Sequence, residues 1–160
     1  MTTQYDVKSE HVTASGVAYG SRTRLKGAVL SPNSTAAKNV IFADNVSKSG
    51  TYDIPGSTVC TITIANHGLS NGDRVWINFT SGTAVDNVYV VAGVTTSTFT
   101  VTTASLTTSG NVTVYSKVLM EVDCFNPTSF GVVIPGEGIL AEAGIYVGVP
   151  ANVTATVFYG

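Results

Sequence analysis

Thr58-Val-Cys-Thr-Ile-Thr-Ile64 opens the stretch of sequence that decides the fold class. It continues with the turn Asn66-His-Gly-Leu-Ser-Asn-Gly-Asp73, the run Arg74-Val-Trp-Ile-Asn-Phe79 and, further on, Thr98-Phe-Thr-Val-Thr102. β-Branched and aromatic residues fit a pleated, half-buried surface, and Gly, Asn and Asp permit the turns between strands. The stretch therefore predicts short strands joined by tight turns, in an all-β protein.

The same pattern extends over the whole chain, with turn signals about every eight to twelve residues and almost no helical periodicity. The predicted strands are Gly16–Tyr19, Arg22–Ser31, Asn39–Asp44, Val59–Ala65, Asp73–Phe79, Val88–Val94, Thr98–Thr103, Asn111–Phe125, Gly131–Ile134, Ile139–Val149 and Asn152–Phe158. Many short strands at regular spacing indicate an antiparallel β-sandwich, of a jelly-roll-like kind.

Charge density indicates two domains. Between Ile54 and Tyr115 the only Lys, Arg, Asp or Glu residues are Asp73, Arg74 and Asp86, whereas charges recur on both sides. We expect residues 54–115 to form a small β-barrel or β-sandwich module, inserted at a hairpin tip, Ser47-Lys-Ser-Gly-Thr51, of an outer β-sandwich domain. Residues 1–53 and 116–160 would form that outer domain. One continuous sandwich is the alternative.

The composition limits the classes of partner. The net charge is −2, which provides no basic face for nucleic acid, and no apolar run approaches the roughly 20 residues of a membrane helix. Only 11% of residues are charged, which predicts a homo-oligomer or larger assembly. Arg22, Arg24 and Lys26 alternate as one solvated face of a strand.

The N-terminus, Met1-Thr-Thr-Gln-Tyr-Asp6, has neither the basic start nor the apolar stretch of a secretion signal. We therefore expect Cys60 and Cys124 to be buried free thiols, although a disulfide between them is an alternative. Neither cysteine has a neighbour at zinc-ligand spacing.

His67, Ser70 and Asp73 are the one grouping that resembles a catalytic set. A catalytic triad is assembled from separated loops, whereas these residues follow one another through two consecutive turns. We interpret them as a corner between two strands in which His67 and Asp73 hydrogen-bond the backbone. No catalytic residues are predicted, and the chain is not expected to be an enzyme.

Two further patterns are weaker. Ile134-Pro-Gly-Glu-Gly-Ile139 lacks the Lys and the helix of a phosphate-binding loop, so it is predicted to be a turn whose tip, Glu137, is a candidate partner contact. The acidic residues do not form a calcium-loop spacing, so no metal or cofactor is predicted. Those residues are Asp44, Asp53, Glu121 and Asp123.

Trp76 lies on the face of its predicted strand that is opposite to the apolar face. Val75, Ile77 and Phe79 fall on one side of the predicted strand, and Trp76 falls on the other with Asn78. Trp76 is therefore either a core residue of a two-faced strand or a contact for a ligand or partner.

Three passages together resemble a small β module of phage structural proteins: His67-Gly-Leu-Ser-Asn-Gly-Asp-Arg-Val75, Tyr89-Val-Val91 and Thr98-Phe-Thr-Val101. The outer parts are similar to small virion proteins of tailed phages, particularly marine and cyanobacterial ones. The passages that carry this second resemblance are Val12-Thr-Ala-Ser-Gly16, Ser21-Arg-Thr-Arg-Leu25, Ile134-Pro-Gly-Glu-Gly-Ile-Leu140 and Val157-Phe-Tyr-Gly160.

The resemblance implies a non-enzymatic virion structural protein, a multi-copy accessory component that decorates the capsid or tail and contacts other virion proteins. Its location would be the virion, assembled in the host cytoplasm. Long, weakly charged strands such as Asn111–Phe125 would offer edges for pairing between subunits. The alternative is a host-surface or glycan-binding module of a tail appendage, suggested by Trp76, Tyr89 and the loop Ser81–Asn87. A third hypothesis, a polysaccharide depolymerase, lacks a well-placed pair of carboxylates.

Overall fold

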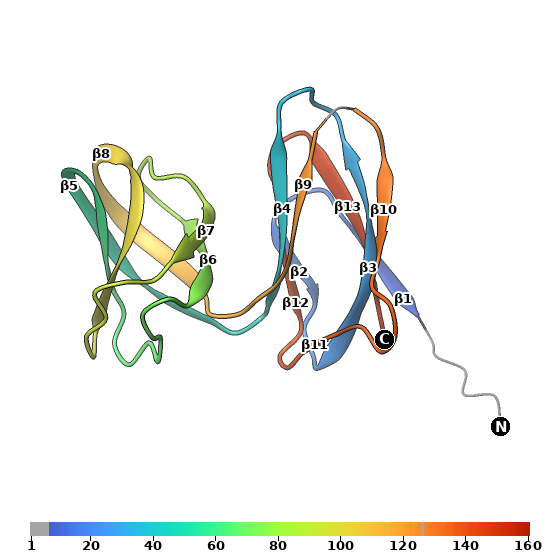
Figure 1. The fold of residues 1–160 in the computed structure, drawn as a ribbon, viewed down its shortest axis with the longest axis horizontal. Coiled ribbons are helices and arrows are strands. Elements are labelled where there is room, and N and C mark those ends of the chain that lie inside the picture. The colour runs from blue at the N-terminus through green and yellow to red at the C-terminus, as the bar shows by residue number, and fades with distance from the viewer. Residues whose placement is uncertain (1–6, 126) are drawn as a thin grey trace. The chain divides into compact units, whose positions relative to one another are not determined.

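The computed structural model describes residues 7–125 and 127–160, and the regular elements in this part of the chain are all β-strands. The chain folds as two compact units, one made of the residues up to Asn45 together with Leu119–Gly160, the other of Val46–Val118 (Figure 1). The prediction of an all-β protein is confirmed. The described residues contain no helix that could span a membrane.

Unit 1 is built from two antiparallel sheets. The first sheet has the order β1 (Lys8–Val12), β13 (Val153–Tyr159), β3 (Thr23–Pro32), β10 (Phe130–Val133), and β11 (Ile139–Ala141) also pairs with β3. The second sheet has the order β2 (Gly16–Tyr19), β12 (Ile145–Gly148), β4 (Lys38–Asp44), β9 (Val118–Cys124).

These strand orders are those of a jelly roll. The chain passes from one sheet to the other between β1 and β2, between β2 and β3, and between β3 and β4. It does so again between β9 and β10, between β11 and β12, and between β12 and β13. As a result the last strand, β13, lies between β1 and β3, so strands from both ends of the chain are neighbours. Two interleaved Greek keys of this kind form two packed sheets, and the jelly-roll-like prediction is confirmed.

The core of unit 1 comes from alternate residues of facing strands. In β13, Val153, Ala155 and Val157 are buried while Thr154 and Thr156 point away, as the two-residue period of a strand requires. The same core contains Leu25, Leu30, Val40, Phe42, Cys124, Ile145 and Val147.

Unit 2 is one four-stranded antiparallel sheet with the order β5 (Ser47–Thr63), β8 (Thr98–Tyr115), β6 (Arg74–Phe79), β7 (Asn87–Val90). Its core contains Tyr52, Ile54, Cys60, Ile62, Phe99, Val101, Val112 and Val114. The two long strands pair from Ser47 opposite Tyr115 to Thr63 opposite Thr98. The expected β-barrel alternative is not found, because the described strands do not close into a barrel.

Bulges bend β5. The register with β8 shifts twice between Pro55 and Val59, and such irregularities bend a strand. The bend brings the start of β5 back against its end, so that a Cβ added to Gly50 would lie 2.1 Å from the carbonyl oxygen of Thr63. Only a glycine fits there, which explains a glycine in the middle of a long strand.

The long β5 differs from two predictions. The expected hairpin tip, Ser47–Thr51, lies inside β5, and so does the expected domain boundary between Asp53 and Ile54. The second boundary, expected after Tyr115, is displaced to Val118. The boundaries predicted from charge density differ from those of the structure because Lys48 and Asp53 occupy exposed positions inside a paired strand. A charge at such a position does not mark the end of a domain.

Other strand predictions need correction. The expected strand Asn111–Phe125 is the end of β8 and the whole of β9, and β8 is paired on both sides, so only β9 lies at a sheet edge. Ile139–Val149 is divided into β11 and β12 by a turn at Gly144, whose φ is 113°. The edge strand β1 was missed because Lys8-Ser-Glu-His-Val12 is mostly polar. The N-terminal segment Met1–Asp6 and Asn126, in a predicted turn, lie outside the described residues.

Gly50→Ala is expected to lower the free energy of unfolding of unit 2 by about 1–3 kcal/mol, because the added methyl group clashes with rigid backbone rather than with a movable side chain. Urea unfolding followed by the fluorescence of Trp76, the single tryptophan, measures this change. Gly16→Ala is the control, since its added Cβ meets nothing within 4 Å. Equal stability of the two variants would contradict the close approach at Gly50.

Candidate functional site

The His67 side chain is fixed by two hydrogen bonds to backbone. Its Nδ1 accepts from the backbone N–H of Leu69 at 3.1 Å, and its Nε2 lies 3.0 Å from the carbonyl oxygen of Thr95. Because the Leu69 N–H can only donate, Nδ1 carries no proton, and Nε2 holds the proton that is donated to Thr95. The ring also packs against Phe99, with a centroid separation of 5.1 Å. Both ring nitrogens are therefore engaged in holding the corner.

The rest of the motif turns the chain. Asp73 Oδ2 accepts the backbone N–H of Ser70 at 2.8 Å, and Asn71 Oδ1 accepts that of Val94 at 3.2 Å. Gly68 and Gly72 have φ values of 74° and 93°, in the left-handed region that glycine adopts without strain. His67, Ser70 and Asp73 thus make separate backbone contacts, and the structure does not bring them together as a nucleophile, base and orienting acid.

Loop 80–86, between β6 and β7, is fixed by hydrogen bonds to β5 and β6. The Tyr52 hydroxyl donates to the Ser81 carbonyl at 2.9 Å, and Asp86 Oδ1 accepts the backbone N–H of Phe79 at 2.7 Å. Burial raises the pKa of Asp86, and the Phe79 hydrogen bond partly offsets this. At Gly82, with a φ of 82°, a Cβ would lie 2.0 Å from the Tyr52 hydroxyl. The loop is thus tied closely to the module beneath it.

Trp76 and Tyr89, the two aromatic residues of the predicted glycan platform, lie on opposite faces of the sheet. Tyr89 is the register partner of Val75, whereas Trp76 is the partner of Val88 on one side and of Tyr115 on the other. Register partners share a face and consecutive residues alternate between faces. Tyr89 packs against Phe79 beside the core, with ring centroids 6.1 Å apart. The two rings cannot form one binding surface.

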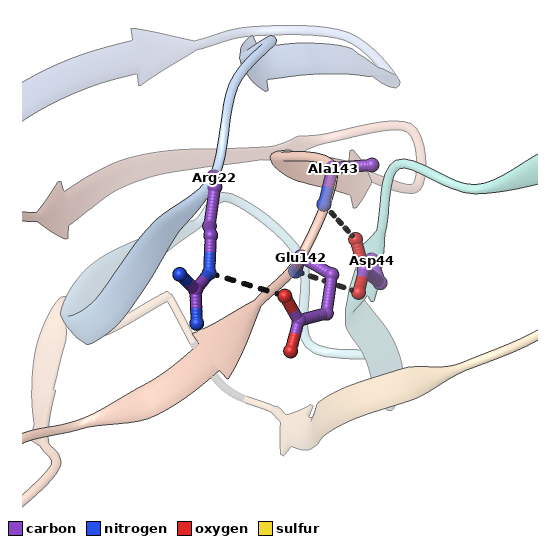
Figure 2. A network of polar contacts seen from close by, with 4 residues as sticks. All are labelled: Arg22, Asp44, Glu142 and Ala143. Atoms are coloured by element: carbon purple, nitrogen blue, oxygen red, sulfur yellow. Dashed lines mark hydrogen bonds and ion pairs between the residues drawn. The ribbon is translucent and has the colours of Figure 1, made fainter.

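In unit 1, a carboxylate holds the turn between β11 and β12. Asp44 Oδ2 accepts the backbone N–H of Glu142 at 2.8 Å, and Asp44 Oδ1 accepts that of Ala143 at 2.9 Å (Figure 2). Glu142 in turn pairs with Arg22, with 3.1 Å between Oε2 and Nε. The exposed fractions of these two side chains are 69% for Arg22 and 53% for Glu142, so the pair adds at most about 1 kcal/mol of stability.

The other two residues of the expected basic strand face are also engaged. Arg24 Nη1 donates to the Gly138 carbonyl at 3.3 Å, and Lys26 Nζ donates to the Glu137 carbonyl at 2.8 Å. They hold the turn between β10 and β11, so the prediction of a purely solvated face is incomplete. Arg22 precedes β3, which begins at Thr23.

A groove that sequence reasoning missed lies at the end of the jelly roll where β13 ends. Its volume is about 600 Å³, and its side-chain lining is both cationic and aromatic. The lining residues are Lys8, Tyr19, Arg22, Thr23, Arg24, Leu140, Tyr159 and Gly160. The resemblance passages Ser21–Leu25 and Val157–Gly160 meet here, but no local pattern in either passage indicates that they are neighbours.

Cys60 and Cys124 are buried free thiols, as predicted, and burial together with the nearby Asp53 charge raises the pKa of Cys60 to about 11. Glu121 accepts from Asn39 Nδ2 at 2.5 Å, and Asp53 and Asp123 are exposed. In the described part of the chain, no three His, Cys, Asp or Glu residues are grouped as metal ligands.

No family model and no curated protein matches this sequence. Among solved structures, the chain is similar to a protein named Phage phi92 endosialidase over 81% of its own length, with 20% sequence identity and a TM-score of 0.33. The chain covers 20% of the length of that protein, and the activity in its name belongs to that protein.

His67→Ala is expected to lower the free energy of unfolding of unit 2 by about 2–4 kcal/mol, because it leaves the Leu69 N–H and the Thr95 carbonyl without their partner. Urea unfolding followed by Trp76 fluorescence measures the loss. Thr96→Ala is the control, since Thr96 is an exposed residue of the same unit and should change stability by less than about 0.5 kcal/mol. Nitrogen NMR of native His67 should show the proton on Nε2, and a proton on Nδ1 would contradict the assignment.

Proposed function

We propose that this chain is a non-enzymatic structural protein of a tailed-phage virion, present in many copies on the capsid or the tail. The proposal rests on one observation: the residues by which the chain resembles phage structural proteins serve to build the fold of unit 2. His67, Asn71 and Asp73 hold the corner, while Leu69 and Val75 fill the core of unit 2. Such a module is built for rigidity.

The architecture of unit 1 supports the proposal. Jelly rolls occur in viral capsid proteins, as well as in lectins and cupins, and this fold supports a capsid role. The candidate catalytic groups of the sequence are engaged with backbone, namely both nitrogens of His67 and a carboxylate oxygen of Asp73. These contacts favour a scaffold over an enzyme.

Mass spectrometry of purified particles of the phage that encodes this chain is the test. The peptides of this chain should co-purify with the particles through a density gradient, at a ratio to the major capsid protein that reflects many copies. Immunogold labelling should then place the chain on the head or on the tail. Particles that infect normally and lack these peptides would contradict the proposal.

We also propose that copies of the chain associate through the outer face of the first sheet. Arg24 of β3 lies on this face where β3 pairs with β11, and it donates to the Gly138 carbonyl. Beyond it, the registers of β1, β13, β3 and β10 place ten uncharged residues on the face. They are Ser9, His11, Gly27, Val29, Ser31, Gly131, Val133, Thr154, Thr156 and Phe158. Val29 and Val133 are 36% and 84% exposed. A broad uncharged surface favours self-association, because few charged groups lose water on contact.

Val133→Lys is expected to convert the oligomer to monomer at concentrations where the native chain associates, because the ammonium group would have to be desolvated in the contact. Size-exclusion chromatography with light scattering, over a series of concentrations, measures the mass. Val85→Lys is the control, since Val85 is also exposed but lies in loop 80–86 of unit 2. A native chain that is monomeric at all concentrations would contradict the self-association.

A further inference from the structure

The cationic groove of unit 1 gathers groups that come from distant parts of the chain. It is lined by the first residue of β1, Lys8, the last residue of β2, Tyr19, the first residue of β3, Thr23, and the last residue of β13, Tyr159. Strand ends meet at this end of the sandwich, near the point marked C in Figure 1. The volume of about 600 Å³ is within the range of small-molecule sites.

The groove concentrates positive charge in a chain that carries little. Lys8, Arg22 and Arg24 are three of the eight Lys and Arg residues of a protein whose net charge is −2. A guanidinium has five N–H donors, so Arg22 keeps donors beyond the Nε that Glu142 binds, and Arg24 keeps donors beyond the Nη1 that Gly138 binds. Both arginines are thus held in place and still able to donate, which favours an anionic ligand.

The wall of the groove supplies flat aromatic surface. The rings of Tyr19 and Tyr159 stack, with centroids 4.7 Å apart and an interplanar angle of 28°. Tyr159 is a core residue and Tyr19 packs against the core, so both rings are firmly placed. A tyrosine ring provides an apolar face for the C–H groups of a ligand and a hydroxyl for a hydrogen bond.

We propose that this groove binds a carboxylated sugar, of the hexuronic acid class, as a unit of an acidic polysaccharide. Lys8, Arg22 and Arg24 bind the carboxylate, and the sugar ring lies against Tyr19, the partly buried ring of the pair, which the stacked Tyr159 holds in place. Three cations on a protein of net negative charge are too few for a nucleic-acid backbone, which needs a basic face. The site does not depend on the proposed virion role, and it replaces the disproved Trp76–Tyr89 platform as a site for glycan.

NMR titration of the full ¹⁵N-labelled chain with D-glucuronate is the test, with D-glucose and inorganic phosphate as comparison ligands. A monosaccharide in an open groove should bind in the millimolar range. The expected result is saturable shifts for glucuronate at the backbone amides of Tyr19, Arg24 and Tyr159, and no saturation for glucose. The affinity should decrease as the salt concentration rises.

Lys8→Gln and Arg22→Gln should each weaken the binding of glucuronate by about tenfold, since each removes a charge-assisted hydrogen bond. Lys38→Gln is the matched control, because Lys38 belongs to unit 1 and does not line the groove. Three results would overturn the proposal: no saturable shifts with glucuronate, equal binding of phosphate and glucuronate, or equal loss of binding in the Lys38 variant. The spectra also show whether each variant keeps its fold.

Discussion

The pairing of β13 with both β1 and β3 is the interaction on which unit 1 depends. The last strand forms one ladder with residues 8–12 and another with residues 25–32, so the first sheet exists only when both ends of the chain are in place. The inward residues of β13, Val153, Ala155 and Val157, belong to the core that both sheets share. The cationic groove follows from the same pairing, because it brings Tyr159 to Lys8 on one side and Gly160 to Arg24 on the other.

Unit 2 depends on a different constraint, the bend of β5. The bulges near Pro55 and Gly56 allow one long ribbon to supply both halves of its core, Tyr52 and Ile54 before the bend and Cys60 and Ile62 after it. The corner motif and the bend of β5 both help to build the core of unit 2. The corner positions Leu69 and Val75, and the bend brings Ile64 beside Gly50. The residues with catalytic-looking chemistry are thus part of the construction of the module.

Much of this fold could be predicted from local pattern. Gly16–Tyr19 has the predicted bounds, and the two-residue period correctly put Val75 and Ile77 on the face opposite to Trp76. The start of β5 could not be predicted, because Gly50, Pro55 and Gly56 signal turns locally and are compatible with a strand only through bulges and close packing. The groove could not be predicted either, since Tyr19 and Tyr159 stack across 140 residues of sequence.

The two units differ in how early each can be completed as the chain is synthesised. Unit 2 is one continuous segment, Val46–Val118, and the ladder of β5 with β8 is available in full once Tyr115 has left the ribosome. At that moment β1, β2, β3 and β4 have left the ribosome, but none of β9 to β13 has. The first sheet of unit 1 then lacks three of its five strands, and the second sheet lacks two of its four. Domains fold as units during synthesis. The inner module is therefore expected to fold first, between the two halves of an outer domain whose first four strands still lack their partner strands.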